Sequence, residues 1–281
     1  MKNNNIDERF IRLALKEDVG NGDITSLALK LGDKRGKAVV IAKANGVLSG
    51  VDQFKSVFKI LDKNVRFKTY KKSGDKVYTK EQILEIRGSM LVLLTGERTA
   101  MNIISHLSGV ATLTSQFAQI VKKYPAKVLD TRKTMPGMRI WEKQAIKHGG
   151  GDNHRIGLYD MYLIKENHIE AAGGITEAID FCKKHSAKTK AKIEVEVKNI
   201  AELRIALKSK PDFILLDNFK TSQLKRSVEI IKETGSNTIL EASGNVNLQS
   251  IKRIAATGVH RISIGQLTHS APVLDLSFRI L

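Results

Sequence analysis

The sequence predicts an α/β protein in which an N-terminal α/β sandwich domain precedes an incomplete (β/α) barrel. From about residue 126 onward, β-branched runs alternate with amphipathic helical segments every 20 to 35 residues or so. Polar side chains gather where these runs end. The first hundred residues lack the alternation and predict a smaller mixed unit.

The smaller unit is expected to combine two helices with several short strands. A loop, VGNGDIT, follows the first helix, and a long helical stretch over residues 89–109 and 112–123 leads into the second domain. The tail PVLDLSFRIL alternates like a strand and can return to either domain. The helices are predicted in DERFIRLALKED and DQFKSVFKIL, and the strands in KAVVIAKANGVLSG, VRFKTYK and QILEIRG.

The larger unit is expected to contain parallel strands joined by crossover helices, because strand and helix signals repeat in turn. The helices are predicted in ITEAIDFCKKH, IAELRIALKS, TSQLKRSVEIIKETG and LQSIKRIAATG. The strands are predicted in AKVLDTR, MYLIKENHI, AKIEVEV, PDFILLDNF, NTILEASG and HRISIG.

The ends of these strands favour a barrel over an open, doubly wound sheet. A doubly wound sheet binds its ligand at one switch point, whereas a barrel collects polar groups from the carboxyl ends of many strands. In IEVEV the period of two places Glu194 and Glu196 on one face, toward the barrel interior, and the apolar residues toward the helices. The strand-end residues are Asp130, Arg132, Lys133, Lys165, Glu194, Glu196, Asp217, Glu241, Ser243 and Gly265.

Composition narrows the classes of function. The formal net charge is +18 and attracts anions of every kind, from nucleic acid to phosphorylated metabolites. Aromatic residues make up only 5%, and no zinc-finger spacing, RNA-recognition pattern or heptad is present, so nucleic-acid binding is the rival we do not expect. No run is apolar enough for a membrane helix or a signal peptide, which predicts a cytoplasmic protein without a membrane partner. The single cysteine, Cys182, fits a helix face.

Residues 130–169 carry the densest group of cations. Arginine forks and lysines at strand ends and on glycine-bearing loops suit a ligand with several carboxylate or phosphate groups. His154 alone is more often structural, but its neighbour Arg155 indicates a pair of donors to an anion. Three cations in this segment fit the outer face of a helix equally well: Arg139, Lys143 and Lys147.

Opposite these cations, Glu196 and Asp217 end two successive strands. Such carboxylates can hold Mg²⁺ or ribose hydroxyls; the alternative is a salt bridge inside the barrel with Lys165 or Lys133. Turns with Ser243, Gly244 and Gly265 follow two further strands, where backbone N–H groups can cradle phosphate.

Motifs along nearly the whole chain resemble those of the quinolinate phosphoribosyltransferase family. They occur in the family's order: EDVGNGDITS, TGERTAMNIISHLSGVAT, DTRKTMPGMR, KHGGGDNHRIGLYDMYLIKENHI, EVEV, ILLDNF, EASGNVN and SIGQLTHS. The resemblance implies the type II phosphoribosyltransferase fold, with a sandwich domain over residues 1–110 and a barrel over 111–269. The tail, residues 270–281, can return to the first domain as a strand.

The resemblance also implies a Mg²⁺-dependent transfer of phosphoribosyl from phosphoribosyl pyrophosphate to quinolinate, with loss of CO₂, in NAD biosynthesis. It implies a homodimer or higher even oligomer in which Arg98 reaches across the interface. The resemblance assigns the catalytic roles to Lys133, Lys165, Glu196 and Asp217, and it implies that Glu196 and Asp217 face Mg²⁺. The implied substrate-binding residues are Arg98, Thr131, Arg132, Lys133, His154, Arg155, Lys165, Glu196, Asp217, Ser243, Gly244, Asn245, Ile264, Gly265 and Gln266.

Two positions depart from the family pattern, which often has glycine where this chain has Asn245 and a small residue where it has Gln266. Asparagine tolerates positive φ better than most residues, so the first turn can keep its shape. The nearest rivals share the fold: molybdenum-transport-associated homologues and nicotinate phosphoribosyltransferases. The dense donor set around His154 and Arg155 suits two carboxylates better than one.

Overall fold

The computed structural model describes residues 4–281, with side chains from residue 8 onward, and divides them into two compact units. The first unit contains the chain up to Leu113, together with residues 136–150 and 271–281. The second contains residues 114–135 and 151–270. The predicted division differs in assigning 136–150 to the barrel domain.

The first unit is built on a four-stranded antiparallel sheet with the order β12-β1-β5-β3. Alternation sets its two faces: Ala38 and Val40 of β1 pair with Ile86 and Leu84 of β5, and all four are fully buried. The tail forms β12 and pairs with β1. The strands are β1 (Arg35–Ala42), β3 (Arg66–Thr69), β5 (Gln82–Ser89) and β12 (Leu276–Ile280), beside a small pair, β2 (Gly46–Val47) and β4 (Lys76–Val77).

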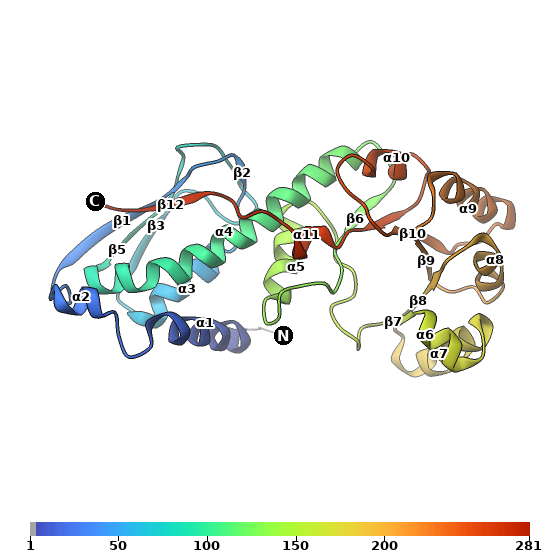
Figure 1. Cartoon of the computed structure of the whole chain (residues 1–281), viewed down its shortest axis with the longest axis horizontal. Helices are drawn as coiled ribbons and strands as arrows, with labels where there is room; N and C mark the ends of the chain where they lie inside the picture. Colours follow the sequence, from blue (N-terminus) through green and yellow to red (C-terminus); the bar gives the residue numbers. More distant parts are fainter. Residues whose placement is uncertain (1–3) are drawn as a thin grey trace. The chain divides into compact units, whose positions relative to one another are not determined.

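In the described part of the chain, five helices accompany this sheet (Figure 1). The two predicted helical stretches after residue 89 form a single helix, α4, whose last turns belong to the second unit. A short helix, α2, begins in the segment predicted as a loop, because Asp23 caps it by accepting a hydrogen bond from the N–H of Ser26 (3.1 Å). The helices are α1 (Asn4–Val19), α2 (Ile24–Ala28), α3 (Val51–Leu61), α4 (Met90–Val121) and α5 (Arg139–His148).

The second unit is a six-stranded parallel sheet with the order β6-β11-β10-β9-β8-β7. Within the described residues the two end strands, β6 and β7, do not pair with each other, so the curved sheet does not close. The predicted incomplete barrel is therefore confirmed. The strands are β6 (Lys127–Leu129), β7 (Met161–Ile164), β8 (Lys192–Val197), β9 (Phe213–Asp217), β10 (Ile239–Ser243) and β11 (Arg261–Ser263).

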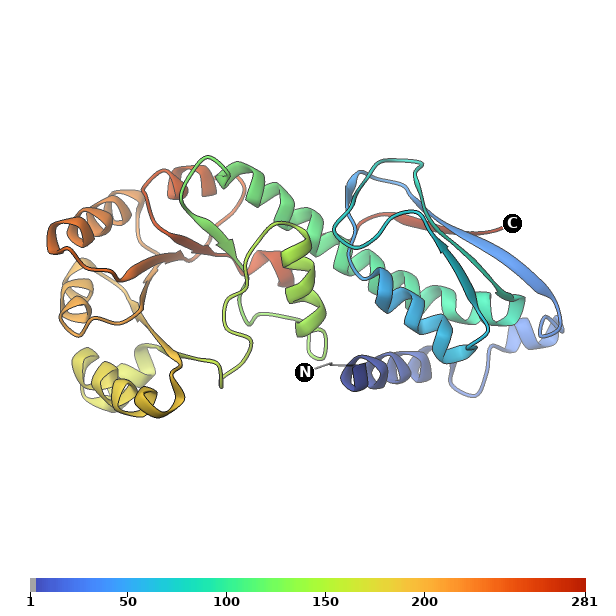
Figure 2. The same ribbon diagram turned by 180° about the vertical axis from the view of Figure 1, so that it is seen from behind.

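Helices lie outside this curved sheet, as the views from both sides show (Figure 1 and Figure 2). Consequently β9, FILLD, is buried along its apolar length and turns polar only at Asp217. Right after each strand the chain leaves the sheet at the same edge, which gathers the strand-end residues there. The helices are α6 (Glu166–Ala172), α7 (Ile175–Thr189), α8 (Ile200–Lys208), α9 (Thr221–Thr234), α10 (Ile251–Ala255) and α11 (Gln266–His269). No helix in the described chain is both long and apolar enough to cross a membrane.

Candidate active site at the mouth of the parallel sheet

A cavity of about 760 Å³ opens at the carboxyl ends of the six parallel strands. Every strand contributes to its wall, through its last residues or through the loop that follows. Fourteen of the fifteen substrate-binding residues predicted above line it: Thr131, Arg132, Lys133, His154, Arg155, Lys165, Glu196, Asp217, Ser243, Gly244, Asn245, Ile264, Gly265 and Gln266.

Arg98, the fifteenth, lies on α4 in the first unit, where its side chain is exposed. The helix carrying Arg139, Lys143 and Lys147 also belongs to the first unit, and none of the three lines the cavity. Lys143 is only 3% exposed, so the expectation of an outer helix face is wrong for this residue.

Two guanidinium groups form a cationic wall. The Nε atoms of Arg132 and Arg155 are buried and, in the described part of the chain, have no hydrogen-bond partner. Burial lowers the pKa of Arg155, and the neighbouring charge of Arg132 lowers it further. Two like charges with unused buried donors beside a cavity indicate an anionic ligand, which would supply the missing acceptors.

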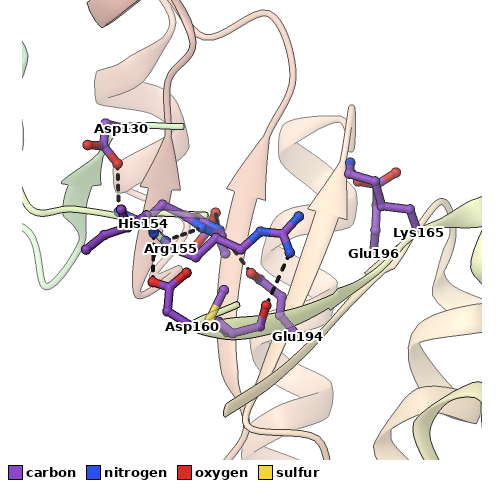
Figure 3. A network of polar contacts seen from close by, with 10 residues as sticks. Asp130, His154, Arg155, Asp160, Lys165, Glu194 and Glu196 are labelled. Carbon is purple, nitrogen blue, oxygen red and sulfur yellow. Dashed lines mark hydrogen bonds and ion pairs between the residues drawn. The ribbon is translucent and has the colours of Figure 1, made fainter. Parts of the chain in front are cut away.

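The loop that presents Arg155 is held by side chains of its own neighbourhood (Figure 3). The N–H of His154 donates to the carboxylate of Asp130 (2.7 Å), which directly follows β6. Farther on, the N–H groups of Ile156 and Gly157 donate to Asp160 (2.7 and 2.9 Å). Because successive N–H groups are bound in this way, the loop presents Arg155 from a fixed backbone.

The His154 side chain points away from solvent, into the barrel. Its Nε2 lies 2.9 Å from a carboxylate oxygen of Glu194 and 3.4 Å from one of Glu241. Burial opposes the imidazolium, but the contacts with the two carboxylates outweigh it and raise the pKa of His154 to about 9. The N–H of Arg155 donates to Nδ1 (2.8 Å) and is the contact that favours the neutral ring. Burial and the nearby Glu241 raise the pKa of Glu194.

Lys165, which follows β7, and Glu196, near the end of β8, form an ion pair in the cavity wall, with Lys165 Nζ donating to Glu196 Oε2 (2.5 Å). The salt bridge considered for the barrel interior therefore exists, and it lies in the wall of the cavity. Asp217, at the end of β9, accepts a hydrogen bond from the amide of Asn218 (2.9 Å). Both carboxylates thus combine a structural contact with a place on the cavity.

Two glycine-bearing turns complete the wall. Gly244 has a φ of +99°, and a Cβ there would lie 2.1 Å from Oδ1 of Asn218. Asn245 also has a positive φ, 47°, which asparagine tolerates. A Cβ at Gly265 would meet Lys133 and His269 at 3.1 Å. Glycine is therefore needed at 244 for its backbone conformation, whereas a side chain at 265 would have to displace the Lys133 and His269 side chains slightly.

Asn245 supplies a first prediction about these turns. We expect Asn245→Gly to keep the KM for phosphoribosyl pyrophosphate within about threefold, because glycine accepts positive φ, whereas Asn245→Val should raise it about tenfold or more, because a β-branched residue resists that conformation. Initial-rate kinetics on both variants measure the difference. Equal KM values for the two would show that the shape of this turn does not control phosphate binding.

The prediction missed polar residues that also line the cavity. Asn218 has a left-handed φ of 54°, and its N–H donates to the carbonyl of Ser243 (2.9 Å), which joins the ends of β9 and β10. The sequence signal that could have identified Asn218 is its place beside Asp217, directly after the apolar run of β9. His269 is the last residue of the short α11 and Ser270 follows it, and both line the cavity together with Gln266 at the start of that helix.

A larger depression, about 1010 Å³, lies at the opposite ends of β8, β9 and β10. Its charged side chains include Lys192 and Asp212, which pair with each other (2.7 Å). In the part of the chain that the structure describes, no buried donor without a partner lines this depression, and barrel enzymes bind substrates at the carboxyl ends of the strands. The smaller cavity is therefore the candidate active site.

Two family models match the chain. The model of the quinolinate phosphoribosyl transferase N-terminal domain matches residues 23–108, and the model of the C-terminal domain matches residues 110–279. Together they span both units.

Two relatives and one solved structure are similar to this chain over almost their full length. A probable nicotinate-nucleotide pyrophosphorylase [carboxylating] of Synechocystis is 40% identical over 98% of this chain and 92% of its own. One from Bacillus subtilis is 41% identical over 94% and 90%. The solved nicotinate-nucleotide pyrophosphorylase of Francisella tularensis has a TM-score of 0.93 and 41% identity over 99% of this chain and 97% of its own.

Proposed function

Since this chain belongs to the quinolinate phosphoribosyltransferase family, we propose that the cavity at the mouth of its parallel sheet is where that family's reaction takes place. Its activity is that of a decarboxylating quinolinate phosphoribosyltransferase, a glycosyltransferase of NAD biosynthesis. The observation that carries the assignment of the site is the pair of unused, buried guanidinium donors beside carboxylates and glycine turns in one cavity.

Quinolinate carries two carboxylates, and the cationic wall supplies donors for both. Arg132 and Arg155 are the residues proposed to grip them, with Thr131 and Lys165 adding a hydroxyl and an ammonium from neighbouring strand ends. His154 contributes from the same loop, chiefly by its contact with Arg155. A ring fixed by two carboxylates has its nitrogen aimed in one direction, which is the orientation that a displacement reaction needs.

Phosphoribosyl pyrophosphate is proposed to lie across the remaining wall. Glu196 and Asp217 face its ribose hydroxyls, and the turns at 243–245 and 264–266 face its 5′-phosphate. Lys133 stands between the two substrates; its carbonyl accepts a hydrogen bond from Thr268 (2.6 Å), which holds it beside Gly265. The hard oxygen donors of Glu196 and Asp217 also fit Mg²⁺, which takes few protein ligands and would neutralise pyrophosphate charge.

The reaction requires no nucleophile from the protein. The pyridine nitrogen displaces pyrophosphate from C1 of the ribose, and the lysines stabilise the negative charge that departs. The bond from the ring to the adjacent carboxylate then breaks, CO₂ leaves, and the positively charged nitrogen accommodates the electron pair before C2 gains a proton. The task of the cationic wall is to keep the other carboxylate in place throughout.

Arg98 enters the proposal through the oligomer. Its exposed side chain on α4 is free to meet another copy of the chain, so we assign it to the partner's quinolinate site in a dimer or higher even oligomer. Arg98→Ala mixed with Arg155→Ala provides the test. Two inactive variants that recover part of the activity on mixing would support sites shared between subunits, and no recovery after verified subunit exchange would contradict it.

One assay tests the function directly. The purified protein, phosphoribosyl pyrophosphate and Mg²⁺ are combined with quinolinate, nicotinate or nicotinamide in turn, and pyrophosphate and CO₂ are measured. We expect equal amounts of both products with quinolinate and background levels with the two monofunctional pyridines, because these leave buried donors unpaired. Turnover of nicotinate alone would overturn the proposal in favour of a sister enzyme.

A further inference from the structure

Two buried carboxylates beneath the cavity have no part in the function proposed above. Glu194 lies on β8 and Glu241 on β10, and both are 0% exposed. In the described part of the chain neither has a hydrogen-bond partner of good geometry, and both make ion-pair contacts with Nε2 of His154. Burying two carboxylates around one imidazole is costly, so the arrangement calls for a reason.

We propose that Glu194 and Glu241 are positioning residues that hold the His154 ring and, through it, fix Arg155 for the substrate carboxylate. This inference rests on the proposed function, because it assigns the two glutamates to the quinolinate side of that same site. It makes them act through His154 and not by touching substrate.

A continuous series of contacts carries the inference (Figure 3). Nε2 of His154 meets the glutamates at 2.9 and 3.4 Å, and its Nδ1 lies 2.8 Å from the backbone N of Arg155. The N–H of His154 itself donates to Asp130. One residue is therefore tied to β8, β10 and the end of β6, and the backbone of Arg155 follows directly from it.

The guanidinium of Arg155 is fixed at its far end as well. Its Nη1 donates to the carbonyl of Met161 (3.2 Å), at the start of β7, while its Nε is left without a partner. With both ends held, the unused donor keeps one orientation. A donor that is already oriented loses less entropy when it binds a carboxylate than one that must first be ordered.

Charge supplies a second reason. Arg155 and Arg132 repel each other before a ligand arrives, and Glu194 is an opposite charge close enough to favour the charged form of Arg155. Glu194 thus offsets part of the repulsion between the two arginines. Glu194 does not line the cavity, so the cavity mouth stays cationic for an anionic substrate.

Glu194→Gln separates this role from a merely structural one, because glutamine keeps the shape of the side chain and removes its charge. We expect the KM for quinolinate to rise about tenfold, while the KM for phosphoribosyl pyrophosphate and kcat change by less than about threefold. A general loosening of the barrel would raise both KM values together, and that result would overturn the inference.

A double-mutant cycle sharpens the test. In an Arg155→Ala background, Glu194→Gln should change the KM for quinolinate by less than about twofold, because the residue it positions is gone. The same tenfold change in both backgrounds would overturn the inference. Should Glu194→Gln not fold, Glu241→Gln takes its place, since Glu241 lies farther from Nε2.

The chain offers a matched control in Glu142, another fully buried carboxylate, which contacts Nε2 of His106 (2.7 Å) in the first unit. Glu142→Gln should lower thermal stability as Glu194→Gln does, but it should not raise the KM for quinolinate. Failure of the wild-type protein to use quinolinate would overturn the proposed function itself. An active wild type with an unselective Glu194→Gln variant would overturn only the present inference.

Discussion

Arg155→Ala should lower kcat/KM for quinolinate about 1000-fold, which corresponds to about 4 kcal/mol. The guanidinium offers a fork of donors to a carboxylate, and charge-assisted hydrogen bonds contribute about 1.5–3 kcal/mol each. The Nε of Arg155 is buried and has no hydrogen-bond partner within the described chain, so it can donate to a ligand carboxylate. Initial rates at saturating phosphoribosyl pyrophosphate, with quinolinate varied, give the measurement.

Arg155→Lys and Arg204→Ala are the companions of this variant. Lysine keeps the charge but loses the fork, so an intermediate loss, about 10- to 100-fold, is expected. Arg204 is exposed on α8 and does not line the cavity, so its removal should leave quinolinate kinetics unchanged. If Arg155→Ala binds quinolinate as tightly as wild type, the cationic wall does not hold the dicarboxylate.

Much of this site was predictable because parallel strands and polar strand ends are both local signals. Lys165, Asp217 and Ser243 each follow or end an apolar run, and parallel strands bring such positions to one edge. The same reasoning placed Glu194 and Glu196 on one face of β8. Period and polarity therefore predicted the sheet and the charged part of the cavity wall, whereas Thr131, Asn245, Ile264 and Gln266 entered by resemblance alone.

What could not be predicted depends on contacts between distant segments. His154 was expected among the substrate donors, and nothing local indicates that its ring turns inward to Glu194 and Glu241, which lie 40 and 87 positions farther along the chain. Lys143 fitted an outer helix face and the cationic cluster equally well, but it is buried on α5 and does not line the cavity. Arg98 entered by resemblance, since an exposed residue on a long helix carries no signal of its own.

Glu196→Gln is expected to impair the use of phosphoribosyl pyrophosphate without weakening the binding of quinolinate. The glutamate now pairs with Lys165 at 2.5 Å and is proposed to face the ribose and Mg²⁺. Losing its charge should lower kcat/KM for phosphoribosyl pyrophosphate about 100-fold, or about 3 kcal/mol, and raise the Mg²⁺ concentration needed for half-maximal rate. Quinolinate binding should stay the same or tighten, because Lys165 is released from its partner and offers its full charge to the carboxylates.

Titration of quinolinate into the Mg²⁺-free variant isolates the second effect from the first. A Kd for quinolinate equal to or below that of wild type, together with the loss for phosphoribosyl pyrophosphate, would place Glu196 on the ribose side of Lys165. Loss of affinity for both substrates would instead mean that the Lys165–Glu196 ion pair mainly maintains the structure of the cavity wall. Glu229→Gln is the matched control, because this exposed carboxylate pairs with Arg226 (2.9 Å) on α9 and does not line the cavity. Since surface ion pairs contribute little, it should leave both substrates' kinetics unchanged.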